Sequence, residues 1–229
     1  MCRMIAFASK QLLNVDPYFQ ALKEQAQHGK NSPHKDGWGV ALYGENDFTL
    51  KKSEDFILHV TELSVQARMA VLHARKSSST GASVFFSHPF VYDFHEKIWA
   101  FAHNGIIKGL PTLSNGEIDT QVYCRIFIDE LRNGDPIEAM RRTVEKIRSE
   151  GFEYTSLNAF VANGSQLCAF RITSKRQDAY HTIFYKRSPD TVVISTEQFG
   201  NGWAELENES YIITDITNHE MKVEVGKIF

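Results

Sequence analysis

The chain has 229 residues and a net charge of −3 at pH 7; 42% of its residues are hydrophobic and 12% are aromatic. This apolar content can fill a sizeable core, which argues against a disordered chain. No basic excess exists to neutralise phosphates and no run of about 18 apolar residues occurs, so we expect no nucleic acid and no membrane as partner.

The first half of the chain alternates strand patterns with one helix. Residues 2–8 predict a buried strand, and Asp16-Pro17 offers an N-cap and a first-turn proline for a helix that runs to about His28. A polar loop follows from 29 to 36. The remaining elements expected in this half are a hairpin of 37–43 and 48–52, a short helix near 54–62, and strands at 67–74, 83–86 and 97–103.

The second half contains two adjacent helices and then strands. Apolar residues at helical spacing predict one helix over 119–132, and Asp135-Pro136 opens another that runs to about Glu150. Further strands are expected at 157–162, 167–172, 179–187, 191–195, 210–214 and 220–225. This order indicates a layered α+β architecture with mainly antiparallel sheets. Neither an internal repeat nor a long linker occurs, so we expect one domain over 1–229.

The three cysteines are Cys2, Cys124 and Cys168. An odd number without a CxxC pair fits neither a disulfide framework nor a zinc site and suggests a reducing, cytoplasmic compartment. The nine histidines form no HxxxH array. We therefore expect no metal and no cofactor.

Cys2 is a candidate nucleophile. Removal of Met1 would make Cys2 the N-terminal residue, and its α-amino group, with an ordinary pKa near 8, could then act as a base for its own thiol. The alternative is a small buried residue in a strand. Cys2 therefore indicates a catalytic nucleophile only in combination with other residues.

Asn104 and Gly105 follow the apolar strand that ends at His103. An Asn-Gly turn can take a positive φ, and it could aim the Asn104 amide and the Gly105 N–H at one point, as an oxyanion hole requires. The alternative is an ordinary hairpin turn.

Arg75 ends another buried strand, before the hydroxyl-rich run 77–80. There it could hold a substrate carboxylate by a two-point contact, or it could be a solvated charge. Asp119 begins the 119–132 helix and could bind a substrate ammonium or serve as an N-cap.

Taken together, these motifs resemble a known family. Cys2, Asp36-Gly37-Trp38-Gly39, His73-Ala74-Arg75, His88-Pro89, His103-Asn104-Gly105 and Asp119-Thr120 occur in the order seen in class II glutamine amidotransferases. The resemblance extends over essentially the whole chain and is strongest to stand-alone bacterial members. It implies the four-layer αββα sandwich of the N-terminal-nucleophile (Ntn) hydrolases.

The resemblance also implies roles for these residues. Cys2 would be the nucleophile and its freed amine the general base, with Asn104 and Gly105 as the oxyanion hole. Arg75 and Ser78 would bind the substrate α-carboxylate, and Asp119 its α-ammonium. The residues implied to shape the pocket are His34, Asp36, Trp38, His88 and His103.

The implied reaction is hydrolysis of the γ-amide of glutamine or of a γ-glutamyl compound through a thioester. Lys76 stands where biosynthetic members have tryptophan, which puts free glutamine as the substrate in question. The alternatives are a glutaminase subunit that delivers ammonia to a separate synthetase partner, an acylase for another amide, and a catalytically silent ligand-binding module. A homodimer is a further possible assembly.

Overall fold

A computed structural model describes residues 2–77, 80–111, 116–131, 134–175, 178–218 and 220–229. Two large antiparallel sheets dominate the fold. The seven-stranded sheet has the order β13-β11-β12-β1-β4-β2-β3. Its strands are β1 (Arg3–Asn14), β2 (Trp38–Tyr43), β3 (Phe48–Ser53), β4 (Gln66–Ala74), β11 (Ile183–Arg187), β12 (Thr191–Ser195) and β13 (Ala204–Leu206).

The six-stranded sheet has the order β15-β14-β10-β9-β6-β5. Its strands are β5 (Phe90–Phe94), β6 (Lys97–Asn104), β9 (Asn158–Ala162), β10 (Gln166–Arg171), β14 (Ser210–Thr217) and β15 (Glu220–Lys227). A separate short ladder joins β7 (Ile107–Lys108) to β8 (Glu153–Tyr154).

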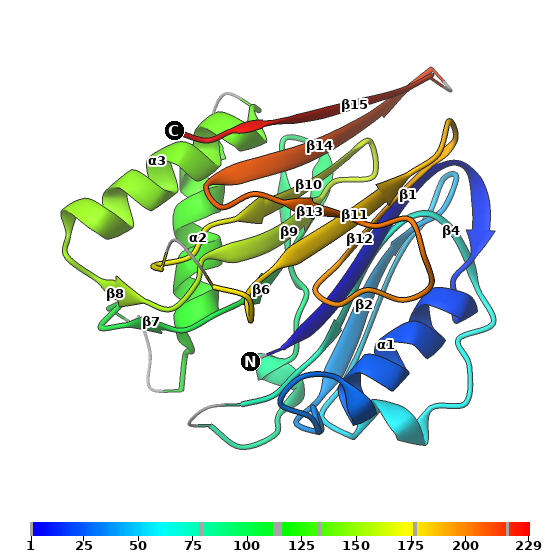
Figure 1. The fold of residues 1–229 in the computed structure, drawn as a ribbon, viewed down its shortest axis with the longest axis horizontal. Helices are drawn as coiled ribbons and strands as arrows, with labels where there is room; N and C mark the ends of the chain where they lie inside the picture. The colour runs from blue at the N-terminus through cyan, green and yellow to red at the C-terminus, as the bar shows by residue number, and fades with distance from the viewer. Residues whose placement is uncertain (1, 78–79, 112–115, 132–133, 176–177, 219) are drawn as a thin grey trace.

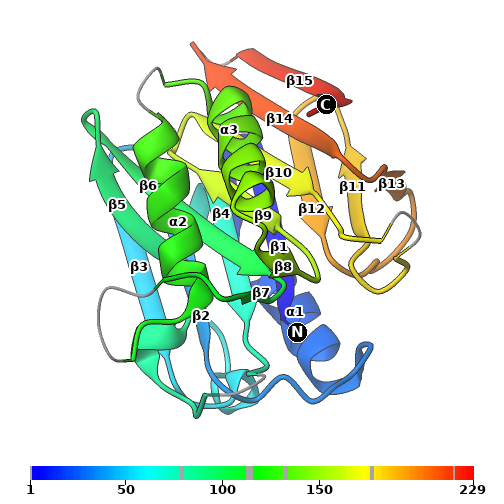
Figure 2. The ribbon, with the colours of Figure 1, turned by 90° about the vertical axis from the view of Figure 1, so that its left-hand side faces the viewer.

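The two sheets face each other, and helices cover their outer faces (Figure 1). Helix α1 (Asp16–His28) packs on the seven-stranded sheet, whereas α2 (Asp119–Glu130) and α3 (Pro136–Ser149) pack on the six-stranded sheet, as Figure 2 shows from the side. The four layers therefore follow the order α, β, β, α, as predicted. Among the described residues, no helix is long and apolar enough to cross a membrane.

Residues 4–8 of strand β1 form an unbroken apolar run because both faces of this segment are buried. Met4, Ala6 and Ala8 point into the core between the sheets, while Ile5 and Phe7 point into the core beneath α1. A strand that is covered on both faces has no polar side to show in its pattern. Alanines from both sheets recur in the central core, where small side chains allow the sheets to approach.

Several sequence expectations are confirmed, and others are wrong. The predicted helices at 16, 119 and 135, the hairpin, and the strands ending at Ala74 and near His103 are present. The expected strand at 83–86 is instead a 3₁₀ turn, Val84–Phe86, because the Ser83 hydroxyl accepts the Phe85 N–H and turns the chain. The short helix near 54–62 is a single 3₁₀ turn, Ile57–His59. Strand β5 was not expected.

Asp16 is not the N-cap of α1; Val15 takes that position. The Asp16 carboxylate instead accepts the backbone N–H groups of Leu63 at 2.7 Å and of Ser64. It therefore ties the start of α1 to the loop that leads into β4.

The ends of four elements meet at one place. Arg3 at the start of β1 is paired with Ala74 at the end of β4, and Asn104 at the end of β6 is paired with Asn158 at the start of β9. The start of α2 lies beside them, because Ile107 donates its N–H to the Asp119 carboxylate. This junction is where the candidate site forms.

Candidate active site

A cavity of about 250 Å³ opens at this junction. Its volume is below the ~300–1,000 Å³ of pockets that take drug-sized ligands, so it suits a compact molecule such as an amino acid. Its walls are unusually rich in charged and hydroxyl groups. The lining residues are Cys2, Arg75, Lys76, Ser77, Thr80, His88, His103, Gly105, Ile106, Ile107, Glu117, Ile118, Asp119 and Thr120.

Cys2 lies at the wall of this cavity with 8% of its surface exposed. Its Sγ faces the Lys76 carbonyl oxygen at 4.0 Å. Burial raises the pKa of the Cys2 thiol, and the nearby charges of Arg75 and Arg3 oppose that rise. A thiol that burial keeps protonated needs a base close to it before it can act as a nucleophile.

Asn104 contacts Cys2 across 102 residues of sequence. The Cys2 nitrogen donates to Asn104 Oδ1 at 2.9 Å, and the Asn104 side chain is fully buried. Because Oδ1 accepts this bond, Nδ2 is the donor end of the amide. Nδ2 has no hydrogen-bond partner among the described residues. Asn104 is not among the residues that line the cavity, but its buried amide donor belongs to a side chain in contact with Cys2 and has its hydrogen-bonding capacity unused.

Gly105 follows directly and lies against the chain at Ser156. A Cβ atom on Gly105 would lie 1.9 Å from the Ser156 carbonyl oxygen and 2.7 Å from His103 Nε2. The expected positive φ is not found, since Gly105 is not among the glycines with that conformation. Close approach of the backbone, rather than turn geometry, is what demands a glycine here.

Arg75 is held by its own loop. Its Nη1 donates to the carbonyls of Asp36 at 3.2 Å and Gly81 at 3.1 Å, and its Nη2 donates to the hydroxyls of Ser77 at 3.2 Å and Thr80 at 2.6 Å. Both hydroxyls line the cavity. Each hydroxyl accepts from the guanidinium, and the two hydroxyl oxygens lie 3.1 Å apart, so either hydroxyl can donate to the other or direct its hydrogen toward an anion in the cavity.

Asp119 lines the same cavity as this cluster. Its Oδ2 accepts the N–H of Ile107 at 2.7 Å, and its Oδ1 accepts that of Thr120 at 2.9 Å. Ile118, not Asp119, occupies the N-cap position of α2. The carboxylate is thus fixed in orientation, and each oxygen retains a lone pair for a cation.

His103 and His88 form the floor of the cavity as neutral imidazoles. His103 Nε2 lies 3.0 Å from the Ser156 carbonyl, which can only accept, so Nε2 carries the proton and Nδ1 accepts from the Thr120 hydroxyl at 2.9 Å. Burial lowers the pKa of His103 and holds that of His88 well below its usual range. The His88 ring stacks on His73 at 4.1 Å between centroids.

The remaining predicted residues lie outside the cavity lining. Asp36 Oδ2 accepts the N–H of Ser77 at 2.8 Å and so supports the Arg75 loop. Trp38 is a core residue beneath α1, with its ring edge-on to Phe19. His34 is fully buried behind the site. Ser78 lies outside the described residues.

The sequence reasoning missed several residues that line or support the site. Ser77 and Thr80 belong to the hydroxyl-rich run, so that run was the available signal. Glu117 lines the cavity and pairs with Arg125 at 2.5 Å. Arg3, which lies within the predicted first strand, has no exposed surface and forms an ion pair with Glu197 at 2.7 Å.

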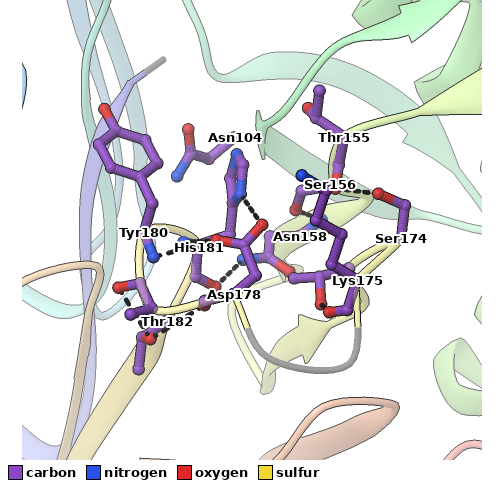
Figure 3. A network of polar contacts seen from close by, with 12 residues as sticks. Asn104, Thr155, Ser156, Asn158, Ser174, Lys175, Asp178, Tyr180, His181 and Thr182 are labelled. Carbon is purple, nitrogen blue, oxygen red and sulfur yellow. Dashed lines mark hydrogen bonds and ion pairs between the residues drawn. The ribbon is translucent and has the colours of Figure 1, made fainter.

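A polar network supports the end of β6 from the other side. Asn158 donates to the His181 carbonyl at 2.7 Å and accepts the Ile172 N–H at 2.8 Å, and His181 Nδ1 lies 2.6 Å from Asp178 Oδ2. Figure 3 shows this network around the loop of residues 178–182, with Asn104 beside it. Among the described residues, no group of His, Cys, Asp or Glu is placed to hold a metal ion.

Residues 1–197 match a family model described as "Glutamine amidotransferases class-II". An uncharacterized protein of Methanocaldococcus jannaschii is 26% identical over 93% of this chain and 59% of its own length. The chain spans between 47% and 62% of the length of the three curated relatives that it matches.

Two solved structures share the fold. One is a glutamine aminotransferase class-II domain protein from Silicibacter pomeroyi, with 17% identity, a TM-score of 0.68 and full coverage of both chains. The other is the glutamine phosphoribosylpyrophosphate amidotransferase of Bacillus subtilis, with 14% identity, a TM-score of 0.69, and coverage of 100% of this chain and 49% of that chain. At these identities the likeness concerns the fold alone, and it confirms the predicted Ntn-hydrolase sandwich.

Proposed function

The chain belongs to the class II glutamine amidotransferases, and from this premise we propose that it is an N-terminal-cysteine amidohydrolase. Its substrate is the γ-amide of glutamine or of a γ-glutamyl compound, and the reaction passes through a γ-glutamyl thioester on Cys2. The observation that carries this proposal is the 2.9 Å contact from the Cys2 nitrogen to Asn104 Oδ1, which leaves the buried Nδ2 without a partner among the described residues.

In the first half of the reaction, the α-amine of processed Cys2 takes the thiol proton, and Sγ attacks the γ-carbonyl carbon. The oxygen of the tetrahedral intermediate receives hydrogen bonds from Asn104 Nδ2 and the Gly105 N–H. The protonated α-amine then gives its proton to the leaving amine as the C–N bond breaks. This leaves the γ-glutamyl thioester and releases ammonia or the corresponding amine.

In the second half, water attacks the thioester carbonyl carbon and gives up a proton to the α-amine. The C–S bond breaks, the Cys2 sulfur is reprotonated, and glutamate leaves. The same two donors stabilise the oxyanion in both halves, because the carbonyl oxygen keeps its place throughout.

The charges of the cavity support an amino-acid head group. We propose that the cluster of Arg75, Ser77 and Thr80 receives the α-carboxylate and that Asp119 receives the α-ammonium. The arginine lies behind the two hydroxyls, so a carboxylate meets either two hydroxyl donors or an N–H released from one of them. The opposite charges at the two sides of the cavity fix the orientation of the substrate.

The decisive experiment profiles glutamate release from glutamine, γ-glutamyl amines and γ-glutamyl peptides with N-terminally processed protein. A Cys2→Ala variant and a form whose N-terminus is extended by an uncleavable peptide are the controls, and both should be inactive. Intact mass must show loss of Met1 in the active sample. Turnover by the extended form would refute the proposal. The absence of turnover by the processed wild type with every donor would also refute it.

A second candidate is ammonia supply to a separate acceptor enzyme. It is favoured by the likeness to an amidotransferase of which this chain covers only 49%. The two candidate functions differ in what happens to the amide nitrogen and in whether the rate depends on a partner. A free hydrolase releases ammonia and glutamate in equal amounts at an undiminished rate without any partner, whereas a supply subunit gains activity when its acceptor enzyme is added.

A further inference from the structure

Arg3 is a charged side chain with no exposed surface, next in sequence to the nucleophile. Its Nη1 donates to the Cys2 carbonyl at 3.3 Å, and its Nη2 donates to the Lys30 carbonyl at 2.5 Å. Its guanidinium also lies over the Tyr180 ring, 5.2 Å from the centroid. Arg3 thus connects the first residue of the site to two distant segments.

Glu197 is the counter-ion of Arg3. Its Oε1 lies 2.7 Å from Arg3 Nη2 and accepts the Lys30 N–H at 2.6 Å, and 17% of its side chain is exposed. Buried ion pairs of this kind contribute little net stability, because desolvation of the charges offsets their attraction. Stability alone is therefore a weak reason for burying an arginine at this position.

The position of the pair matters for the α-amine. The nitrogen of a residue lies no more than about 3.6 Å from its own carbonyl oxygen, so the Arg3 guanidinium is within roughly 7 Å of the Cys2 nitrogen. A cation at that distance in a buried site favours the neutral form of an amine, which is the form that accepts a proton. A carboxylate has the opposite effect.

Other groups face the same amine from every surrounding element. Burial, with Arg3 as the next cause, lowers the pKa of His34 to about 3, and burial lowers that of His181 despite its bond to Asp178. Both imidazoles are therefore neutral at pH 7. Among the described residues, the charged groups that line the cavity with Cys2 are Arg75, Lys76, Glu117 and Asp119. Outside the lining, Asp36 acts on Arg75, Asp178 pairs with His181, and Glu197 pairs with Arg3.

We propose that Arg3 and Glu197 are a positioning pair that sets the basicity of the Cys2 α-amine. Arg3 keeps the amine neutral near pH 7 and fixes the Cys2 carbonyl, while Glu197 limits this effect and holds the guanidinium in place. The proposal rests on the proposed function, in which this amine is the base. Neither residue touches the substrate.

The test compares Arg3→Met, Arg3→Lys, Glu197→Gln and the double variant Arg3→Met/Glu197→Gln, all N-terminally processed. The first readout is the titration midpoint of the Cys2 amine, followed by the Cα resonance of protein labelled with ¹³C-cysteine. The second is the acidic limb of kcat/KM against pH with the best γ-glutamyl donor. Arg68→Met removes a partly buried arginine of the same sheet, far in sequence from Cys2, that pairs with Glu45 at 2.9 Å, and it is the matched control.

The two single charge removals must act in opposite directions. Arg3→Met should raise both midpoints by about 0.5–1 pH unit and Glu197→Gln should lower them, since one unit corresponds to about 1.4 kcal/mol of differential interaction. Arg3→Lys and the double variant should lie near the wild type, as should Arg68→Met. The double variant leaves no unpaired buried charge, so it keeps the comparison available if Arg3→Met does not fold.

The proposal would be overturned if the midpoints of Arg3→Met and Glu197→Gln stayed within about 0.2 unit of the wild type. It would also be overturned if both midpoints moved in the same direction. The resonance titration does not require turnover. If the wild type hydrolyses no donor but its amine midpoint still responds to the two charges, the proposed function fails while the electrostatic role of the pair survives.

Discussion

Gly105 and Ser156 come together so closely that a Cβ atom on the glycine would lie 1.9 Å from the serine carbonyl oxygen. The same carbonyl accepts a hydrogen bond from His103 Nε2 at 3.0 Å. The segment 103–105 is therefore packed closely against Ser156, two residues before β9. This contact places Asn104 and the Gly105 N–H beside Cys2.

Gly105→Ala should destabilise the protein and abolish its activity. No side-chain rotation can relieve a clash between a Cβ atom and a backbone oxygen, so one of the two segments must move, at a cost of about 3 kcal/mol or more. Gly81→Ala is the matched control for stability, because a Cβ there meets nothing within 4 Å. Urea unfolding measures both variants, and glutamate release measures Gly105→Ala against the wild type. An active Gly105→Ala protein of wild-type stability would contradict this account.

Asn104→Ala should lower kcat by about 10²–10³, the usual effect of losing one oxyanion donor. KM should change little, because the donor acts mainly on the charge that develops in the transition state. Asn163→Ala serves as the comparison. Its Oδ1 accepts the N–H groups of Ser165 and Gln166 in a distant turn, so that variant should lose stability but keep its turnover. Equal kcat values in the two variants would rule out Asn104 as a donor.

More of the fold than of the site could be predicted from the sequence. The run from Cys2 to Ala8 and the helix from Asp16 to His28 were predictable because burial on both faces and helical periodicity are local signals. Strand β5 was missed because it follows directly on the His88-Pro89 pair and is short, and its pairing with β6 is a tertiary effect.

In the site, local motifs located the residues but not their contacts. The order of motifs singled out Cys2, Arg75, Asn104 and Asp119. The structure places Cys2, Arg75 and Asp119 around one cavity, whereas Asn104 is buried and contacts Cys2. The Arg3–Glu197 pair joins residues 194 positions apart, and no spacing rule predicts such a contact. From the sequence, a glycine is expected at 105 because of a turn with positive φ. The actual reason is the close contact with Ser156, which is 51 residues further along the chain and so gives no local signal.

Arg75→Lys should raise KM for glutamine by at least about tenfold. Lysine cannot reproduce the planar fork that holds two backbone carbonyls and two hydroxyls at once, so the carboxylate-binding cluster should lose its geometry. Alkylation of Cys2 by iodoacetamide, which has no amino-acid head group, should change by less than about threefold. Arg68→Lys provides the surface control. An unchanged KM would remove Arg75 and its loop from substrate binding.

Asp119→Asn should reduce discrimination for a free α-ammonium. We expect the ratio of kcat/KM for glutamine to that for N-acetylglutamine to fall at least tenfold, equivalent to about 1.4 kcal/mol. The asparagine keeps one of the two acceptor oxygens, so unfolding by urea must accompany the kinetics. Asp93→Asn, at an exposed position on β5, is the control. A ratio that does not change would place the ammonium elsewhere.

His34 should make stability depend on pH below neutrality. Its pKa is about 3 in the folded protein, because burial and then Arg3 disfavour the charged imidazole, whereas the unfolded chain takes up a proton below about pH 6.5. The unfolded state therefore binds more protons between pH 6.5 and 3, and the free energy of unfolding must fall as the pH falls through this range.

The His34 contribution should be about 2 kcal/mol between pH 6.5 and 5. Urea unfolding at pH 7.5, 6.5, 5.5 and 5.0 measures it, with pH values chosen to bracket the unfolded-state pKa. His34→Gln should lose less stability than the wild type over this range, although His73 and His88, whose pKa values burial also lowers, leave a residual slope. His28→Gln changes an exposed histidine and should retain the full slope. If His34→Gln and wild type show the same decline, His34 is not held neutral by the fold.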